Sequence, residues 1–196
     1  MYPSLFPLIL FCSVAAFTPG PNNILGSYSG FNFGIKKSIP LILGVAFGYP
    51  FLLIVLAAGL IIVFKTYPVL QIILKVCGSG FLIYLAYKIS FQNKVQQQTV
   101  TNPVKFFHTF IFQFINPKGV IIAIITISTF VETGSNYLFH SIVVVAVSFC
   151  CAITSITSWC LLGKFLKRFA TNEKFIQIFN YVMSFLLIVC VIMFYL

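Results

Sequence analysis

Acidic residues are almost missing from this chain of 196 residues, which has two glutamates, Glu132 and Glu173, and no aspartate. Both glutamates fall outside the long apolar runs of the sequence, and the two histidines, His108 and His140, stand far apart. Hydrolysis inside a membrane needs paired carboxylates, metal ligands, or a nucleophile with a base. We therefore expect no enzyme and no catalytic residue.

Metal-ligand patterns are missing as well. The six cysteines all lie within apolar runs, and no pair has the two-residue spacing of a zinc or redox motif. Packing is the simpler role for such polarizable side chains. Hard divalent cations need cages of carboxylate or carbonyl oxygens, so the missing acids count against a divalent-metal exporter. We expect neither a metal nor a cofactor.

Charge is scarce and apolar sequence is abundant: 7% of the residues are charged and 60% are hydrophobic, which a water-soluble domain does not carry. A spanning helix needs ~20 apolar residues. Runs of this kind lie at residues 5–25, 39–64, 69–91, 106–131, 137–162 and 175–196. The predicted fold class is an all-α membrane protein with six transmembrane helices in one domain, 1–196. The short connections leave no room for a soluble domain.

The net charge of +10 suggests nucleic-acid binding until its twelve basic residues are placed along the chain. Nine of them mark alternate connections: Lys36, Lys37, Lys88, Lys94, Lys105, Lys164, Lys167, Arg168 and Lys174. Basic connections of membrane proteins face the cytoplasm, so both termini are predicted outside and no nucleic acid is expected. No basic residue precedes the first apolar run, and five more apolar runs follow it. We therefore interpret the first run as a retained helix and not as a secretion signal.

The first apolar run is interrupted at residues 17–23, Phe-Thr-Pro-Gly-Pro-Asn-Asn. Pro19 and Pro21 remove backbone donors, and Gly20 tolerates conformations that other residues avoid. Pro21 suits the first position of a restarting helix. The amides of Asn22, Asn23 and Ile24 would then be free donors at the positive end of a half-helix.

A second interruption lies inside the fourth run at residues 113–119, Gln-Phe-Ile-Asn-Pro-Lys-Gly. Asn116 is a good N-cap and Pro117 a good first residue, so this helix too is predicted to stop and restart. Freed backbone groups are tolerated in hydrocarbon only where they face protein or a water-filled cavity. Both interruptions are therefore expected to line one internal space.

The two interruptions stand at corresponding places of two halves. They begin 97 residues apart, at Pro19 and Asn116, and each falls in the first helix of a three-helix half, about 1–98 and 99–196. Because each half has three helices, the second half crosses the membrane in the opposite direction to the first. Broken helices in two such inverted repeats are typical of transporters with a substrate site near the midplane of the bilayer. The alternative is that the prolines only kink helices for packing.

At these residues the chain resembles the LysE/RhtB family of amino-acid exporters. The resemblance rests on residues 18–23 and 116–118, and extends to Gly34 with its basic pair, to Gly44 and Gly48, and to Lys75 with Gly78. Residues 19–25, Gln113-Phe114 and residues 128–131 are most similar to the cysteine/O-acetylserine exporter branch. This resemblance implies an inner-membrane protein that exports small amino acids, driven by the proton gradient.

The chain departs from the family pattern at three places. Exporters of basic amino acids carry an aspartate after the second glycine of the second helix, where this chain has Tyr49, and Phe81 and Ala86 replace a usual tyrosine and glycine. Because no span holds an acid, a cationic side chain would lack a counter-ion. Neutral substrates are therefore expected, of the cysteine/O-acetylserine or the homoserine, threonine or branched-chain kind.

Ten residues are expected to bind the substrate: Pro19, Gly20, Pro21, Asn22, Asn23, Tyr49, Gln113, Asn116, Pro117 and Lys118. Lys118 lies deep in the fourth run, where its charge either holds the substrate carboxylate or caps carbonyls freed at Pro117. The expected partners are a small amino-acid substrate and the lipid bilayer, and a homodimer is left open. A channel or a structural subunit is the alternative function.

Overall fold

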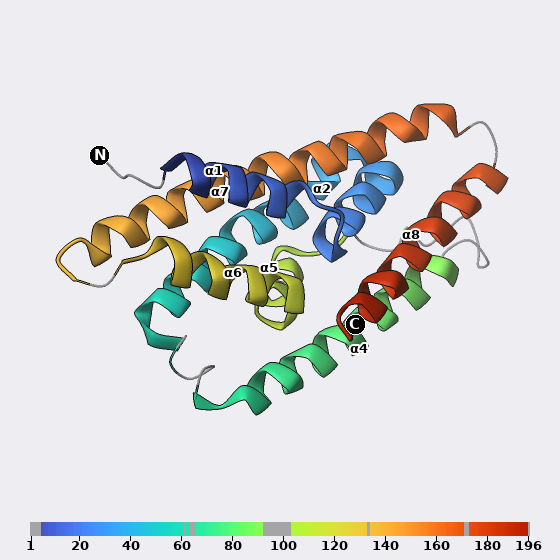
Figure 1. Ribbon diagram of the computed structural model, residues 1–196. Coiled ribbons are helices and arrows are strands. Elements are labelled where there is room, and N and C mark those ends of the chain that lie inside the picture. Colours follow the sequence, from blue (N-terminus) through green and yellow to red (C-terminus); the bar gives the residue numbers. More distant parts are fainter. Residues whose placement is uncertain are drawn as a thin grey trace.

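The computed structural model describes residues 5–60, 62, 66–91, 103–132, 134–170 and 173–195, and these residues form helices and connections without a strand (Figure 1). The α-helices are α1 (Leu5–Phe17), α2 (Pro21–Val55), α4 (Pro68–Phe91), α5 (Phe106–Ile115), α6 (Pro117–Phe130), α7 (Tyr137–Leu166) and α8 (Glu173–Met193). A π-helical turn, Leu56–Leu60, follows α2, and a 3-10 turn, Lys167–Phe169, follows α7.

The all-α membrane class is confirmed, whereas the six-span inverted repeat stays a prediction. Among the described residues, the helices long and apolar enough to cross a membrane are Pro21–Gly59, Tyr137–Phe169 and Lys174–Met193. The pair α5 and α6 passes the same test only when taken together, and is bent by 65° at the break between them, as in a broken span or a re-entrant loop. Glu173, predicted in a connection, is instead the first residue of α8.

The predicted connection between the first two spans is reduced to a single residue inside α2. Gly34 has φ 74° and ψ 171°, a conformation open to glycine and strained for other residues, and helix continues on both sides of it. The expectation of a longer non-helical connection between residues 25 and 39 was therefore wrong, because one glycine in a left-handed φ suffices to redirect the chain.

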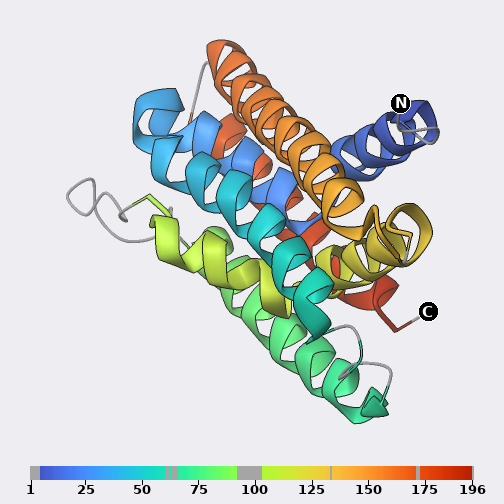
Figure 2. The ribbon, with the colours of Figure 1, turned by 90° about the vertical axis from the view of Figure 1, so that its left-hand side faces the viewer.

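The two parts of α2 pack along α7 in opposite directions (Figure 2). In the first part, Gly26 lies against Ile156, and Lys167 Nζ donates to Asn32 O at 3.5 Å, so sequence numbers rise together along both helices. Beyond Gly34 they run oppositely: Phe47 packs on Phe149 with ring centroids 5.3 Å apart, and Tyr137 Oη donates to Ala57 O. The chain thus reverses at Gly34, and α7 serves both parts as a common support.

A second helix pair, α4 and α8, lies beside this bundle (Figure 1). Ser184 Oγ donates to Ala86 O at 2.6 Å and Ser90 Oγ donates to Ser184 Oγ at 2.6 Å. Gly78 of α4 packs against the end of α5, at the carbonyl of Ile115 and the ring of Pro117. These contacts fix the interruption between α5 and α6 against the rest of the fold.

Candidate functional site

The first helix stops and restarts where the two prolines require it. Helix α1 ends at Phe17, after which Thr18 N donates to Val14 O at 3.0 Å. Gly20 is extended, with φ −174° and ψ 177°, and Pro21 is the first residue of α2. The predicted interruption and the predicted restart at Pro21 both match the structure.

Two backbone amides, not three, are left free at the start of α2. Ile24 N donates to Gly20 O at 2.9 Å, so the predicted third free donor makes the first hydrogen bond of the helix. Asn22 N and Asn23 N precede that bond and so have no partner within the helix, and the N-cap residue, Gly20, has no side chain to cap them. Asn23 instead donates through Nδ2 to Ala16 O at 2.7 Å and Thr18 O at 3.0 Å, which ties the end of α1 to the start of α2.

The second interruption separates α5 from α6 at one residue, Asn116, which has extended backbone angles. Asn116 holds the N-cap position and Pro117 the first helical position, as predicted. The predicted side-chain cap is absent: the Asn116 side chain makes no capping bond, and its Oδ1 is buried with no hydrogen-bond partner among the described residues. A buried polar atom left unpaired is costly, which marks Asn116 as a candidate for ligand contact.

The two interruptions are bonded directly to each other. The amides of Asn22 and Gln113 pair reciprocally: Asn22 Nδ2 donates to Gln113 Oε1 at 2.8 Å, and Gln113 Nε2 donates to Asn22 Oδ1 at 3.2 Å. Gln113 is fully buried, and its Nε2 also donates to Thr109 O at 2.7 Å. A fully satisfied pair of this kind fixes the position of each helix end against the other.

Lys118 forms the second bond between the interruptions. Its Nζ donates to Thr18 O at 2.9 Å and to Pro19 O at 3.3 Å. Of the two roles predicted for Lys118, the capping of carbonyls freed at Pro117 differs from the structure in its partners, because the ammonium reaches the carbonyls of the other interruption. Gly20 makes room for this approach: a Cβ added there would lie 2.9 Å from Nζ.

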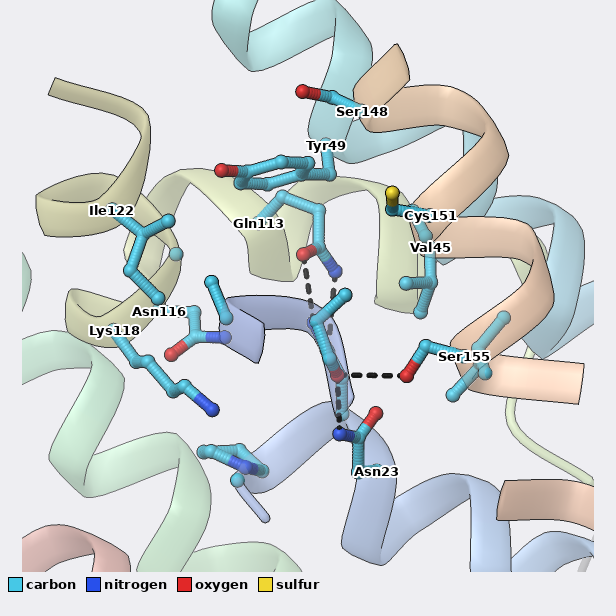
Figure 3. Close-up of a pocket in the computed structure, with 18 of the residues that line it drawn as sticks. Asn23, Val45, Tyr49, Gln113, Asn116, Lys118, Ile122, Ser148, Cys151 and Ser155 are labelled. Atoms are coloured by element: carbon cyan, nitrogen blue, oxygen red, sulfur yellow. Dashed lines mark hydrogen bonds between the residues drawn. The ribbon is translucent and has the colours of Figure 1, made fainter. Parts of the chain in front are cut away.

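A cavity of about 80 Å³ lies where the two interruptions meet (Figure 3). Ligand pockets for drug-sized molecules span ~300–1,000 Å³, so this cavity suits only a small solute. Eight of the ten predicted site residues line it: Gly20, Pro21, Asn22, Asn23, Tyr49, Gln113, Asn116 and Lys118. Pro19 contributes its carbonyl to the Lys118 contact, and Pro117 is buried against Gly78.

Residues of α1 and α7 complete the cavity, and sequence reasoning missed them. Cys12, Ser148, Cys151 and Ser155 all line it. On α7 the three positions are spaced by three, four and seven residues, which places them on one helix face. That spacing of small, weakly polar residues within an apolar run was the signal available in the sequence.

The cavity surface is mostly apolar, and Lys118 is the one charged residue among those that line it. Within the described part of the chain, no three histidine, cysteine or acidic side chains lie close enough to hold a metal ion. The cavity wall combines the ammonium of Lys118 with Asn22 and Asn23 from the N-terminal turn of α2. Its chemistry suits an anionic group.

Apolar helices long enough to cross a bilayer, with a small cavity between two broken helices, are typical of multi-pass membrane transporters. A family model described as "LysE type translocator" matches residues 13–196, and the chain belongs to this family. The family likeness predicted from residues 18–23 and 116–118 is thus confirmed.

Relatives of this chain are named for efflux. A cysteine/O-acetylserine efflux protein of Escherichia coli O1:K1 / APEC is 28% identical over 183 residues, which cover 91% of each chain. The protein of that name from Escherichia coli strain K12 is 27% identical over the same length and with the same coverage. No solved structure matches the chain.

Proposed function

We propose that this protein exports small neutral amino acids, or close derivatives such as O-acetylserine, across the inner membrane and is driven by the proton gradient. The observation that carries the proposal is the cavity between the two broken helices, which Lys118, Asn22 and Asn23 line together. Full-length relatives named as cysteine/O-acetylserine efflux proteins support the substrate class.

The substrate carboxylate binds at the Lys118 end of the cavity. The ammonium supplies charge, and the amides of Asn22 and Asn23 supply directed donors at the positive end of the α2 dipole. Inside a protein such donors act more strongly on an anion than they do in bulk water. A bound carboxylate would replace the Thr18 and Pro19 carbonyls as the partner of Lys118 Nζ.

The substrate ammonium binds near the end of α1. Ala15 lines the cavity. In a helix its carbonyl would accept a hydrogen bond from the backbone N–H four residues later, but that residue is Pro19, which has no N–H. The carbonyl end of a helix carries partial negative charge, which favours a cation. The opposed ends of α1 and α2 therefore suit the two charges of a zwitterionic amino acid.

The transport cycle uses two inverted three-helix repeats. Reciprocal packing supports this arrangement: α1, the broken helix of the first half, lies against α7 of the second half, and α5, the broken helix of the second half, lies against the later part of α2. The Asn22–Gln113 pair joins the two broken helices at the centre. Rocking of one repeat against the other would expose the cavity to each side in turn.

Transport itself is tested with labelled amino acids. We expect everted vesicles from cells that express the protein to accumulate labelled cysteine or serine, and to do so faster with an imposed pH gradient. Vesicles from cells that lack the protein are the control. Equal accumulation in both preparations would contradict export. Equal rates with and without the gradient would contradict proton coupling and leave export standing.

Selectivity for neutral substrates follows from the charges of the cavity. Lys118 repels a second cationic group, and no carboxylate lines the cavity to bind it. We expect expression to protect cells from toxic analogues of small neutral amino acids and to give no protection from lysine or arginine analogues. Growth-inhibition assays measure both. Protection from a basic analogue alone would show that the argument from missing acids is wrong.

The orientation of the termini is a further expected outcome. Lys167 contacts Asn32 next to Gly34, so two of the three basic connections lie at the same end of the bundle. We expect reporter fusions at Phe33, Gln97 and Thr171 to report cytoplasm, and fusions at both termini to report the outside. Gln97 and Thr171 lie outside the described residues. A periplasmic signal at Gln97 would contradict the inverted repeat.

A further inference from the structure

The end of the cavity opposite Lys118 has a different chemistry. Figure 3 shows Lys118 at one side of the drawn group, with Tyr49, Ser148 and Cys151 across it. Cys12 joins this far end as the hydrogen-bond neighbour of Ser148. None of these four residues is an acid or a base of the Asp, Glu, Lys, Arg or His kind, so a ligand anchored at Lys118 would direct an uncharged group toward them.

The wall at this far end is held by contacts between α1 and α7. Cys12 Sγ and Ser148 Oγ are 3.6 Å apart, and Ser13 Oγ and Cys151 Sγ are 3.7 Å apart. One turn further along, Ser155 Oγ donates to Ala16 O at 2.7 Å. Closely packed helices adjust little when a ligand enters. The wall therefore sets a fixed limit on the length of a bound group.

Of the three residues Cys12, Ser148 and Cys151, the least buried is Cys151. Ser148 and Cys12 are 1% and 6% exposed, whereas Cys151 is only partly buried and lines the cavity. A change in the size of Cys151 would therefore change the free length of the cavity more directly than a change at either neighbour.

We propose that Cys12, Ser148 and Cys151 form the site that selects the substrate side chain, with Cys151 limiting its length. Short uncharged groups fit this site: a hydroxymethyl, a thiomethyl or a short aliphatic chain. Weak donors and acceptors on the wall tolerate a hydroxyl or a thiol without requiring one. This inference rests on the proposed export function and adds the residues that set its substrate range.

The test compares serine with homoserine, which differ by one methylene group. Replacing Cys151 by leucine shortens the cavity and is expected to lower the homoserine-to-serine transport ratio in everted vesicles by about tenfold, the low end of what one methylene can discriminate. Replacing Cys151 by alanine lengthens the cavity and is expected to raise the same ratio. Opposite shifts from two substitutions at one position are not expected from a merely structural role.

Cys150 supplies a matched control on the same helix. It is exposed and lines an apolar groove on the other side of α7, with Phe47 and Phe149. Cys150→Leu makes the same chemical change one residue away and is expected to leave the homoserine-to-serine ratio unchanged.

The outcomes separate this inference from the export function. Unchanged ratios in both Cys151 variants, at normal membrane levels, would overturn the selection site while export stands. An equal shift from Cys150→Leu would overturn it too. If Cys151→Leu does not reach the membrane, the smaller Cys151→Ala variant decides. Failure of the unaltered protein to move either amino acid would overturn both proposals.

Discussion

Replacing Lys118 by methionine is expected to abolish export while the protein remains at normal levels in the membrane. The substitution keeps an unbranched side chain that is one heavy atom shorter and removes its charge, so the substrate carboxylate loses its one cationic partner in the cavity. Holding an ammonium deep in a bilayer costs roughly 2.5–3.5 kcal/mol. Removing it should therefore not hinder insertion, and the carbonyls of Thr18 and Pro19 that it bonds can be solvated from the cavity.

Two companion substitutions make this result interpretable. Lys118→Arg keeps the charge and is expected to retain part of the export. Lys75→Met removes a lysine of α4 whose Nζ lies 4.3 Å from the centre of the Tyr195 ring, outside the cavity, and is expected to leave export intact. Transport rates in vesicles, normalised to membrane levels by immunoblot, measure all three. Full transport by Lys118→Met would rule out the carboxylate role, and loss of folded protein in both Lys118 variants would leave a structural role.

The two interruptions could be predicted from the sequence because their causes are local. Pro19, Pro21 and Pro117 lack backbone donors wherever they stand, and a helix cannot pass through them without freeing carbonyls. Their matched places in two halves then suggested a common internal space, where the structure indeed brings them together. The ten expected residues lie at or beside this space for the same reason, although their role in substrate binding stays a prediction.

Partners across the fold could not be predicted in this way. The bonds of Lys118 to Thr18 and Pro19 depend on how α6 lies against the start of α2. Ser148 and Cys151 look like ordinary packing residues in an apolar helix until α1 is known to lie beside them. Local sequence gives the chemistry of a side chain, whereas its neighbours come from tertiary packing.

Close helix packing was also missed, although the sequence carries its pattern. Gly26 and Gly30 are four residues apart, as are Gly44 and Gly48, and such spacing lets membrane helices approach closely. The first pair faces α7 and the second pair faces α5. These four glycines fix the distances between the helices that surround the cavity, which is why they bear on function.

Replacing Gly163 by valine is expected to remove most of the folded protein from the membrane. Gly163 of α7 faces α2 at a point where a Cβ atom would overlap the carbonyl oxygen of Ser27, and Gly30 meets the carbonyl of Cys160 in the same way. Backbone cannot move aside as a side chain can, so α2 and α7 would have to separate. The loss of folding free energy should exceed the ~1–3 kcal/mol typical of overpacking. The reason is that the contact between α2 and α7, the most extensive one between helices of the described residues, would open.

Gly80 provides the matched control for this substitution. It lies within α4, is exposed, and a Cβ atom added there meets nothing within 4 Å. Gly80→Val therefore makes the same change in helix propensity without a clash, and is expected to keep membrane levels near normal. Immunoblots and detergent-solubilised size-exclusion profiles compare the two variants. Similar levels for both would show that α2 and α7 are not held together at Gly163 as closely as their glycines indicate.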